Sequence, residues 1–491
     1  MLSLVRAGAS RRHDPPRSAR APNPVSDANQ RGWRDRDHTR GSLFGSLLVL
    51  ALPLLASSVL GGVVFQLVDL TFLSRLGEAP MAAVIIVNQT LRQLLMLILM
   101  GGSFGSQALI ARAVGEGRID RAEQVAGQLV LLGAGFASFI ALAGLLFPEL
   151  LFSLPGPDPS FYAHGIPYLR LLYLLSFGLV GTQCFVAILV GAGDTTTPFL
   201  VIMVQTAVAI FAEWVLMFGN LGAPALGVRG AALGIAMGQI VAMAIGFSVL
   251  FRGRARVHLR GRHLVPNPAL MREILMLSWP PAIQMGAAVV MTFAYVRLAG
   301  AFGESVQAAY AIGLRLGMIA PMVCFPLATA GATLVGQALG SGNTRRAWRA
   351  IGVALMVHGT VMWSFALGVF LFRNEILGLF SDDPKVIEVG AEYLLYLSGV
   401  FALWAFHFVF MRALHGAGDM LVPMGISLAS TFLVSIPLAA FLSLGTDLGH
   451  QGLWIAFLAT NIFNTLAMGL RVATGRWSQR AAHSGPGPEP S

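Results

Sequence analysis

The chain has 491 residues, of which 56% are hydrophobic and 11% charged, and its mean hydropathy is +0.72. A soluble protein of this length cannot bury so much apolar surface, whereas lipid can cover it. The net charge of +10 comes from arginines in short segments between apolar runs, which is the pattern of cytoplasmic membrane loops. Composition therefore excludes a soluble fold, gives no reason to expect nucleic acid as a partner, and predicts an integral membrane protein in contact with lipid.

Residues 1–42 form the first distinct segment. They are rich in Arg, Pro, Ser and Asp, and they lack an apolar pattern that could pack against a core. This composition is typical of disordered chain, and the missing apolar stretch argues against a signal peptide. We expect a disordered, basic, cytoplasmic tail.

Twelve apolar segments follow, and each is long enough to cross a membrane as a helix of roughly 20 residues. They span about 43–73, 81–108, 124–147, 168–189, 199–218, 231–251, 272–300, 307–335, 347–372, 392–414, 422–443 and 452–472. The sequence therefore predicts an all-α integral membrane protein with twelve transmembrane helices.

Basic and acidic residues divide between the two sides of the predicted membrane. The basic set lies at both ends of the chain and after helices 2, 6 and 8: Arg31, Arg34, Arg36, Arg40, Arg112, Arg118, Arg121, Arg252, Arg254, Arg256, Arg260, Arg262, Arg345, Arg346, Arg349, Arg471, Arg476 and Arg480. The acidic set lies in other loops: Glu78, Asp158, Glu375, Asp382, Asp383 and Asp447. Because arginine-rich loops stay inside, we expect both termini in the cytoplasm, across a bacterial inner membrane.

The chain contains an internal repeat. The sequence Gly-Ala-Gly-Asp at 191–194 recurs at 416–419, and a Gly-x-Gly turn at 115–117 recurs at 340–342, each 225 residues later. Glycine permits the positive φ of a tight turn, and the aspartates, Asp194 and Asp419, are expected to cap the following helices.

The repeat predicts two pseudo-symmetric six-helix lobes in parallel orientation, which suits alternating access to a site between them. The predicted divisions are a tail at 1–42, an N-lobe at 43–251, a cytoplasmic inter-lobe loop at 252–271, a C-lobe at 272–472 and a cytoplasmic tail at 473–491.

At this point the sequence resembles the multidrug and toxic compound extrusion (MATE) family, nearest its DinF-like branch. The resemblance covers about residues 43–472. It rests on the segment Leu-Val-Asp-Leu-Thr-Phe-Leu-Ser-Arg-Leu-Gly at 67–77, on the repeated Gly-Asp loops, and on the helix 8 exit at 333–343. It implies a secondary antiporter that exports organic, often cationic or amphipathic, compounds in exchange for H⁺ or Na⁺.

Two carboxylates inside the membrane are candidates for ion coupling. Ionisable groups at membrane depth are costly and indicate function. Asp69 and Glu213 fall near the outer ends of helices 1 and 5, and the resemblance implies that an Asp at position 69 binds the coupling ion. The branch's neutral Asn and Thr ligands correspond to Ala209 and Ile235 here.

This departure favours H⁺, because Na⁺ needs several oxygen ligands, whereas a proton needs one carboxylate. Na⁺ stays open if the amides of Gln66, Gln205 or Gln239 supply oxygens, and Arg92 is a further candidate for support.

The C-half carries basic residues instead. Aligning the halves from Pro53 and Pro281 places Arg297 opposite Asp69, and Arg92 pairs with Arg315. These arginines either bind helix-end carbonyls or contact an anionic substrate. The candidate cavity residues are Arg297, Arg315 and Trp404, whereas Glu273 and Arg412 are expected to extend to the cytoplasmic surface.

The favoured function is a monomeric exporter of small organic compounds. The alternative is a lipid-linked oligosaccharide flippase of the same wider superfamily, which the intramembrane arginines fit in part. We expect neither an enzyme nor a cofactor or metal, and a nucleotide-binding Gly-x-x-x-x-Gly-Lys-Ser/Thr loop is absent from the sequence. Cys184 and Cys324 are expected to be buried, inert thiols.

Overall fold

The computed structural model describes residues 41–154, 156 and 158–478. Most of the predicted N-terminal tail and the C-terminal tail from 479 onward lie outside the described residues. Within the described part, all regular structure is helical, as predicted. Eleven helices are long and apolar enough to cross a membrane. A bent pair, α7 and α8 at 47°, makes a twelfth span.

The elements follow the twelve predicted segments in order. The N-terminal half contains α1 (Leu43–Ser58), η2 (Val59–Val64), α2 (Phe65–Ser74), α3 (Glu78–Ile86), η3 (Val87–Arg92), α4 (Gln93–Gly115), α5 (Ile119–Leu146), α6 (Pro148–Ser153), η4 (Pro159–Phe161), α7 (Tyr162–Leu174), α8 (Ser176–Ala192), α9 (Thr196–Phe218), η5 (Asn220–Gly222), α10 (Val228–Phe251) and η6 (Gly261–Leu264). The C-terminal half contains α11 (Pro268–Gly300), α12 (Glu304–Gly340), α13 (Thr344–Leu371), α14 (Arg373–Gly378), α15 (Pro384–Gly416), α16 (Leu421–Ala429), η7 (Ser430–Ser435), α17 (Ile436–Leu444) and α18 (His450–Ala473).

Several helices begin earlier than their apolar runs. The side chain of Asn267 accepts a hydrogen bond from the backbone of Leu270, and Pro268 occupies the first turn of α11. A cap and a first-turn proline are strong start signals even where the turn is polar. The inter-lobe segment therefore ends at 267 and not at the predicted 271.

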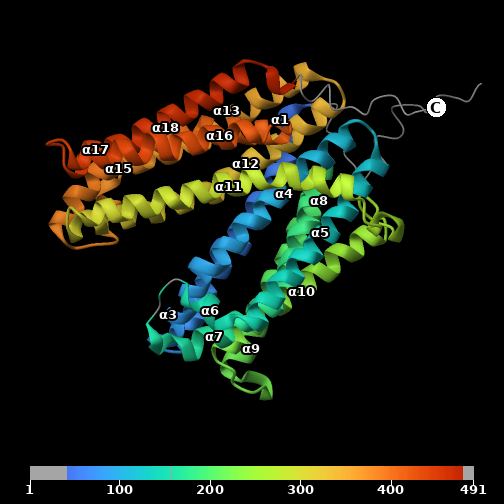
Figure 1. Ribbon diagram of the computed structural model, residues 1–491, viewed down its shortest axis with the longest axis horizontal. Coiled ribbons are helices and arrows are strands. Elements are labelled where there is room, and N and C mark those ends of the chain that lie inside the picture. The colour runs from blue at the N-terminus through green and yellow to red at the C-terminus, as the bar shows by residue number, and fades with distance from the viewer. Residues whose placement is uncertain (1–40, 155, 157, 479–491) are drawn as a thin grey trace, which may run out of the picture.

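The two bundles form a V (Figure 1). The bundles meet at one end, the apex, where α4 packs against α11 and α12, and where α1 packs against α12. The loops after α4 and α12 lie at the apex, and their arginines predict that this end is cytoplasmic. The V then opens toward the predicted outer side.

Helices 1 and 7 each cross to the opposite bundle at the apex. Leu47 and Leu50 of α1 belong to a buried cluster formed mainly by the C-terminal half, whereas Ile274 of α11 belongs to the N-terminal cluster. The predicted lobe limits are therefore correct along the chain but not in space, because each lobe takes part of its inner core from the first helix of the other.

Glycines allow a symmetric close approach at the apex. A β-carbon on Gly115 would lie 2.2 Å from the carbonyl oxygen of Gln337, and one on Gly340 would lie 2.2 Å from that of Arg112. The two contacts exchange partners when positions are shifted by 225 residues. The sequence repeat is thus a pseudo-twofold repeat in space.

The two halves differ by a residue in their second helices. The run from Glu78 to Gly115 has 38 residues and contains the π-helix η3, whereas the uninterrupted α12 has 37. A π-turn accommodates one additional residue. Counted from either end of these runs, Arg92 and Arg315 do not coincide, so their predicted pairing is wrong.

The predicted pairing of Asp69 with Arg297 is also wrong. The turns after helices 1 and 7 match at Gly77 and Gly303, with φ angles of 102° and 101°. Eight residues before these glycines stand Asp69 and Tyr295. The proline alignment failed because the π-helix η2 lies between Pro53 and Asp69 and adds a residue that sequence counting cannot see.

The Gly-Asp loops turn as predicted, with Gly193 and Gly418 at φ angles of 93° and 78°. Asp194 accepts hydrogen bonds from the backbone and the hydroxyl of Thr197, at 3.0 and 2.6 Å, which confirms its capping role. Asp419 forms an ion pair with Arg471 of α18 at 2.6 Å, which the sequence did not predict.

The inter-lobe segment packs along α5. The side-chain amide of Gln128 donates to the carbonyls of His263 and Val265, at 3.1 and 2.9 Å, and its oxygen accepts from the backbone of Asn267 at 2.8 Å. The buried His263 ring lies 3.5 Å from Glu123. This segment therefore fixes the start of α11 against the N-terminal bundle.

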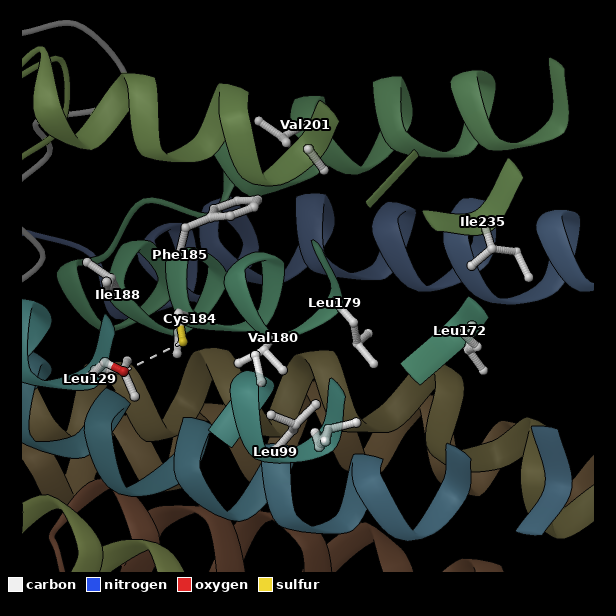
Figure 2. Packing of buried hydrophobic residues seen from close by; sticks show 14 of the residues in the cluster. Leu99, Leu129, Leu172, Leu179, Val180, Cys184, Phe185, Ile188, Val201 and Ile235 are labelled. Carbon is white, nitrogen blue, oxygen red and sulfur yellow. Dashed lines mark hydrogen bonds between the residues drawn. The ribbon is translucent and has the colours of Figure 1, made fainter. Parts of the chain in front are cut away.

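Figure 2 shows the N-terminal core around Cys184, where Leu99, Leu129 and Val180 converge from three helices. The Cys184 thiol contacts the Leu129 carbonyl at 3.8 Å. Both cysteines are free and buried, as expected.

Candidate functional site

Glu213 of α9 is fully buried. Gly230, Gly234 and Gly238 of α10 recur every four residues and bring α10 against α9, so that a β-carbon on Gly234 would lie 2.5 Å from Cγ of Glu213. Neither carboxylate oxygen has a hydrogen-bond partner within the described residues. An unpaired carboxylate is costly to keep ionised in such a place, and protonation removes that cost.

Asp69 of α2 lies in the same region of the N-terminal lobe. It is half-buried, and its Oδ1 also lacks a partner among the described residues. Electrostatic interactions connect Asp69 with Glu213 and connect both carboxylates with Arg92 of η3. The structure therefore brings together the two predicted carboxylates and one predicted supporting residue.

Sequence reasoning missed two neighbours of this group. Tyr168 of α7 is fully buried, interacts electrostatically with Asp69, Glu213 and Arg92, and donates a hydrogen bond to Oδ1 of Asn88 at 3.2 Å. Asn88 lies on η3, four residues before Arg92. The polar run Asn-Gln-Thr at 88–90 inside an apolar helix was a readable signal.

The three predicted amides do not complete an ion cage. Gln205 lies eight residues before Glu213 on α9, about 12 Å along the helix. Gln239 packs against Gly178 of α8, and Gln66 is exposed. Hydrogen bonds from these amides to either carboxylate are absent from the described residues. Ala209 and Ile235, the positions of the branch's neutral ligands, are buried apolar residues.

The matching region of the C-lobe is aromatic. Tyr295, which stands at the place of Asp69, shares a hydrogen bond with Ser435 of η7 at 3.1 Å and stacks with Tyr310. Tyr393 and Trp454 stack beside them, 4.1 Å apart. This pocket is filled by rings, so the ionisable group is confined to the N-lobe.

The predicted C-lobe cavity residues make separate contacts. Arg315 is exposed and lies over the ring of Phe380 at 5.9 Å. Trp404 is partly buried and donates to Oδ1 of Asn461 at 3.0 Å, while Arg297 is exposed. The structure thus leaves the two arginines available to solvent or ligand without bringing them into a single cluster.

Arg412 does not extend to the surface, in contrast to the prediction. It is 1% exposed and lies at the apex, with its guanidinium 4.0 Å from the ring centroid of Phe104. Its Nη2 donates to Gln107 at 2.9 Å, whose amide donates to Thr333 at 3.1 Å. Stacking on an aromatic face offsets part of the loss of hydration. The other residue expected at the surface, Glu273, pairs with Arg121 there at 3.1 Å.

This network connects the two lobes. Phe104 and Gln107 belong to α4, whereas Arg412 and Thr333 belong to α15 and α12. The Nε atom of Arg412 lacks a partner among the described residues, and a cavity of about 10 Å³, roughly enough for one water, lies beside it. A buried cation without a carboxylate partner makes the closed apex less stable than an apolar contact would.

Comparison with known proteins decides the family. The MatE family model matches the chain twice, at residues 53–215 and 280–441. The chain belongs to the MatE family. The two matches begin at Pro53 and Pro280, one residue before the proline used in the sequence alignment of the halves, which agrees with the additional residue in η2.

Several relatives and solved structures are similar over nearly the whole length. The chain is 29% identical to the probable multidrug resistance protein NorM of Thermotoga maritima, over 89% of this chain and 93% of the relative. It is 24% identical to an FAD transporter of Shewanella oneidensis, over 86% and 92%. A crystal structure of a MATE protein in the bent conformation matches with a TM-score of 0.83 at 21% identity, covering 91% of this chain and 98% of that chain. An outward-facing MATE transporter matches with a TM-score of 0.79 at 22% identity. This MatE protein is therefore a multi-pass membrane transporter and not an enzyme.

Proposed function

We propose that this transporter exports organic, often cationic or amphipathic, compounds in exchange for H⁺ by alternating access. The observation that carries the proposal is Glu213, which is fully buried without a hydrogen-bond partner next to Asp69 and Arg92. The relatives named as multidrug resistance proteins support the substrate class.

The ligand set favours H⁺ over Na⁺. A hard cation needs several oxygen ligands at once. Around Glu213 the neighbouring positions are Ala209, Gly234 and Ile235, which offer no side-chain oxygen. A proton needs a single carboxylate, and two are present.

Exchange requires the carboxylates to be reached from both sides. In the observed state the V opens toward the predicted outer side (Figure 1), so protons would reach Asp69 from there. Protonation removes negative charge beside Arg92, and helix 1, interrupted by η2 between Pro53 and Asp69, would then repack and release the substrate outward. Opening of the apex would return the site to the cytoplasm.

The flippase alternative uses the C-lobe arginines instead. The exposure of Arg297 and Arg315 is compatible with an anionic ligand. That function gives the N-lobe carboxylates no task, however, and we favour proton-coupled export for this reason.

The experiment measures export of a cationic dye from vesicles with an imposed pH gradient. Glu213→Gln should reduce this export strongly, because glutamine keeps the shape but cannot exchange a proton at this site. Glu392→Gln, a partly exposed C-lobe carboxylate paired with His450, is the matched control and should behave like wild type. Wild-type coupling in Glu213→Gln at equal abundance would disprove the role of Glu213.

A second arm separates the ions. An uncoupler should stop export in Na⁺-free vesicles, and added Na⁺ should not restore it. Export that follows the Na⁺ gradient and ignores the uncoupler would disprove proton coupling.

A further inference from the structure

An apolar groove runs between α5 of the N-lobe and α11 of the C-lobe. Its volume is about 500 Å³, which is within the usual range for ligand pockets. Its walls include Leu132 and Phe136 of α5, Leu275 and Trp279 of α11, and Val180 of α8. Because both lobes supply a wall, the groove changes shape whenever the lobes move.

The groove lies in the predicted cytoplasmic half of the membrane. At 1.5 Å per residue, Arg272 stands about 6 Å and Ile283 about 22 Å from the start of α11. Since half of a bilayer core is about 15 Å thick, the groove reaches from the headgroup region to slightly beyond the midplane.

The interior of the groove offers few polar groups to a ligand. The hydroxyls of Ser103 and Ser278 donate to carbonyls within their own helices, those of Leu99 and Ile274. The Cys184 thiol on the wall contacts the Leu129 carbonyl (Figure 2). Such a lining favours a hydrocarbon chain over a polar compound.

The cytoplasmic mouth carries a cation. Arg272 is exposed and has no ion-pair partner in the part of the chain that the structure describes. The adjacent Glu273 is already paired with Arg121. The groove therefore changes from one charged end to an apolar interior, as an anionic amphiphile does.

We propose that this groove binds one acyl chain of a phospholipid from the cytoplasmic leaflet, with the headgroup phosphate at Arg272. The depth of the groove, its apolar lining and the unpaired guanidinium all match this ligand. The proposal is independent of the coupling ion, and its test measures binding and not transport.

The experiment is native mass spectrometry of the full chain in detergent, titrated with phosphatidylglycerol. Leu132→Trp and Leu275→Trp fill the groove from opposite walls, and each should remove most of the tightly bound lipid. Phe139→Trp, on an exposed position of α5 outside the groove lining, is the control and should bind like wild type.

A charge arm tests the headgroup contact. Arg272→Gln should weaken phosphatidylglycerol about fivefold, as expected for the loss of one basic residue near a lipid surface, and should leave uncharged diacylglycerol unchanged. Arg170→Gln, another exposed arginine, is the control. Unchanged lipid binding in both groove-filling variants would overturn the proposal, and so would equal weakening of both lipids by Arg272→Gln.

Discussion

At the scale of single residues, the fit between Glu213 and Gly234 leaves no room for a β-carbon. Gly234→Ala would place a methyl group 2.5 Å from Cγ of Glu213 and 2.7 Å from its backbone nitrogen, so the α9–α10 contact must widen. Overpacking of this kind typically lowers stability by about 1–3 kcal/mol. Thermal unfolding in detergent should show a lower midpoint, together with weaker pH-driven export.

The control is Gly352→Ala on α13, where a β-carbon meets no atom within 4 Å. In that open helical position alanine should leave stability unchanged or raise it by about 0.5–1 kcal/mol. Equal effects of the two substitutions would contradict a specific contact at Glu213.

Asp69→Asn tests the second carboxylate. Asparagine keeps the size of the side chain but can neither exchange a proton nor attract Arg92. Gradient-driven export should fall to background at every pH from about 6 to 9, the range in which a proton gradient is easily imposed, while folding measured by size-exclusion chromatography is retained. Asp447→Asn, in a loop, should export normally. Wild-type export by Asp69→Asn across this range would refute the assignment.

At the scale of helices, the buried Arg412 makes the apex contact easier to open. Its hydration is lost when α4 meets α15 and is regained when they part. Arg412→Met keeps much of the volume and removes the charge, so it should leave stability unchanged or higher, since apolar replacements of buried charges are often stabilising by about 1–4 kcal/mol. Export should slow because the closed apex becomes more populated.

Distances between spin labels on the predicted cytoplasmic ends of α4 and α12 measure this population directly. Phe325→Leu, which keeps Arg412 on its nearer ring at Phe104, is a milder comparison and should shift the distances less. A distance distribution in Arg412→Met that moves toward the open apex would show that the arginine is a fastening and not a source of instability.

The inter-lobe segment gives a pH prediction. Burial lowers the pKa of His263 below its ordinary value of 6.5, more than the nearby Glu123 raises it. The folded protein therefore binds this proton less tightly than the unfolded chain does, so docking of the segment is most stable above pH 6.5 and weakens as the pH falls through that value. Hydrogen exchange of residues 252–267, corrected for intrinsic rates, should increase between pH 7.5 and 5.5.

His263→Asn should abolish this pH dependence while Gln128 still holds the backbone. A pH dependence that persists in His263→Asn would assign it to another group.

Helix number, order and repeat were predictable because they depend on apolar length and on glycine turns, which sequence displays directly. Asp69 and Glu213 were also readable as charges within apolar runs. The partners of these charges were not. The additional residues in η2 and η3 displace every later side chain by about 100° around the helix, so Tyr295 and not Arg297 stands opposite Asp69. The burial of Arg412 depends on inter-lobe packing that no local pattern encodes.

At the scale of the molecule, orientation remains a prediction from arginine placement. A membrane-impermeant thiol reagent added outside cells should label Asp382→Cys and should not label His258→Cys. Because Cys184 and Cys324 are buried, the wild-type chain serves as the unlabelled control. The reverse labelling pattern would invert the proposed topology.

The crossing of helices 1 and 7 at the apex constrains how the protein is made. The inner half of α1 packs on α12, which ends at Gly340, almost 300 residues later in the chain. At a synthesis rate of about 5–20 residues per second, α1 is inserted roughly 15–60 s before its partner leaves the ribosome. The N-terminal half therefore cannot reach its final packing during its own synthesis, and the two halves must mature together. Expressed as separate fragments cut at the inter-lobe segment, each half would expose a surface shaped for the other, and only co-expression would yield a stable protein.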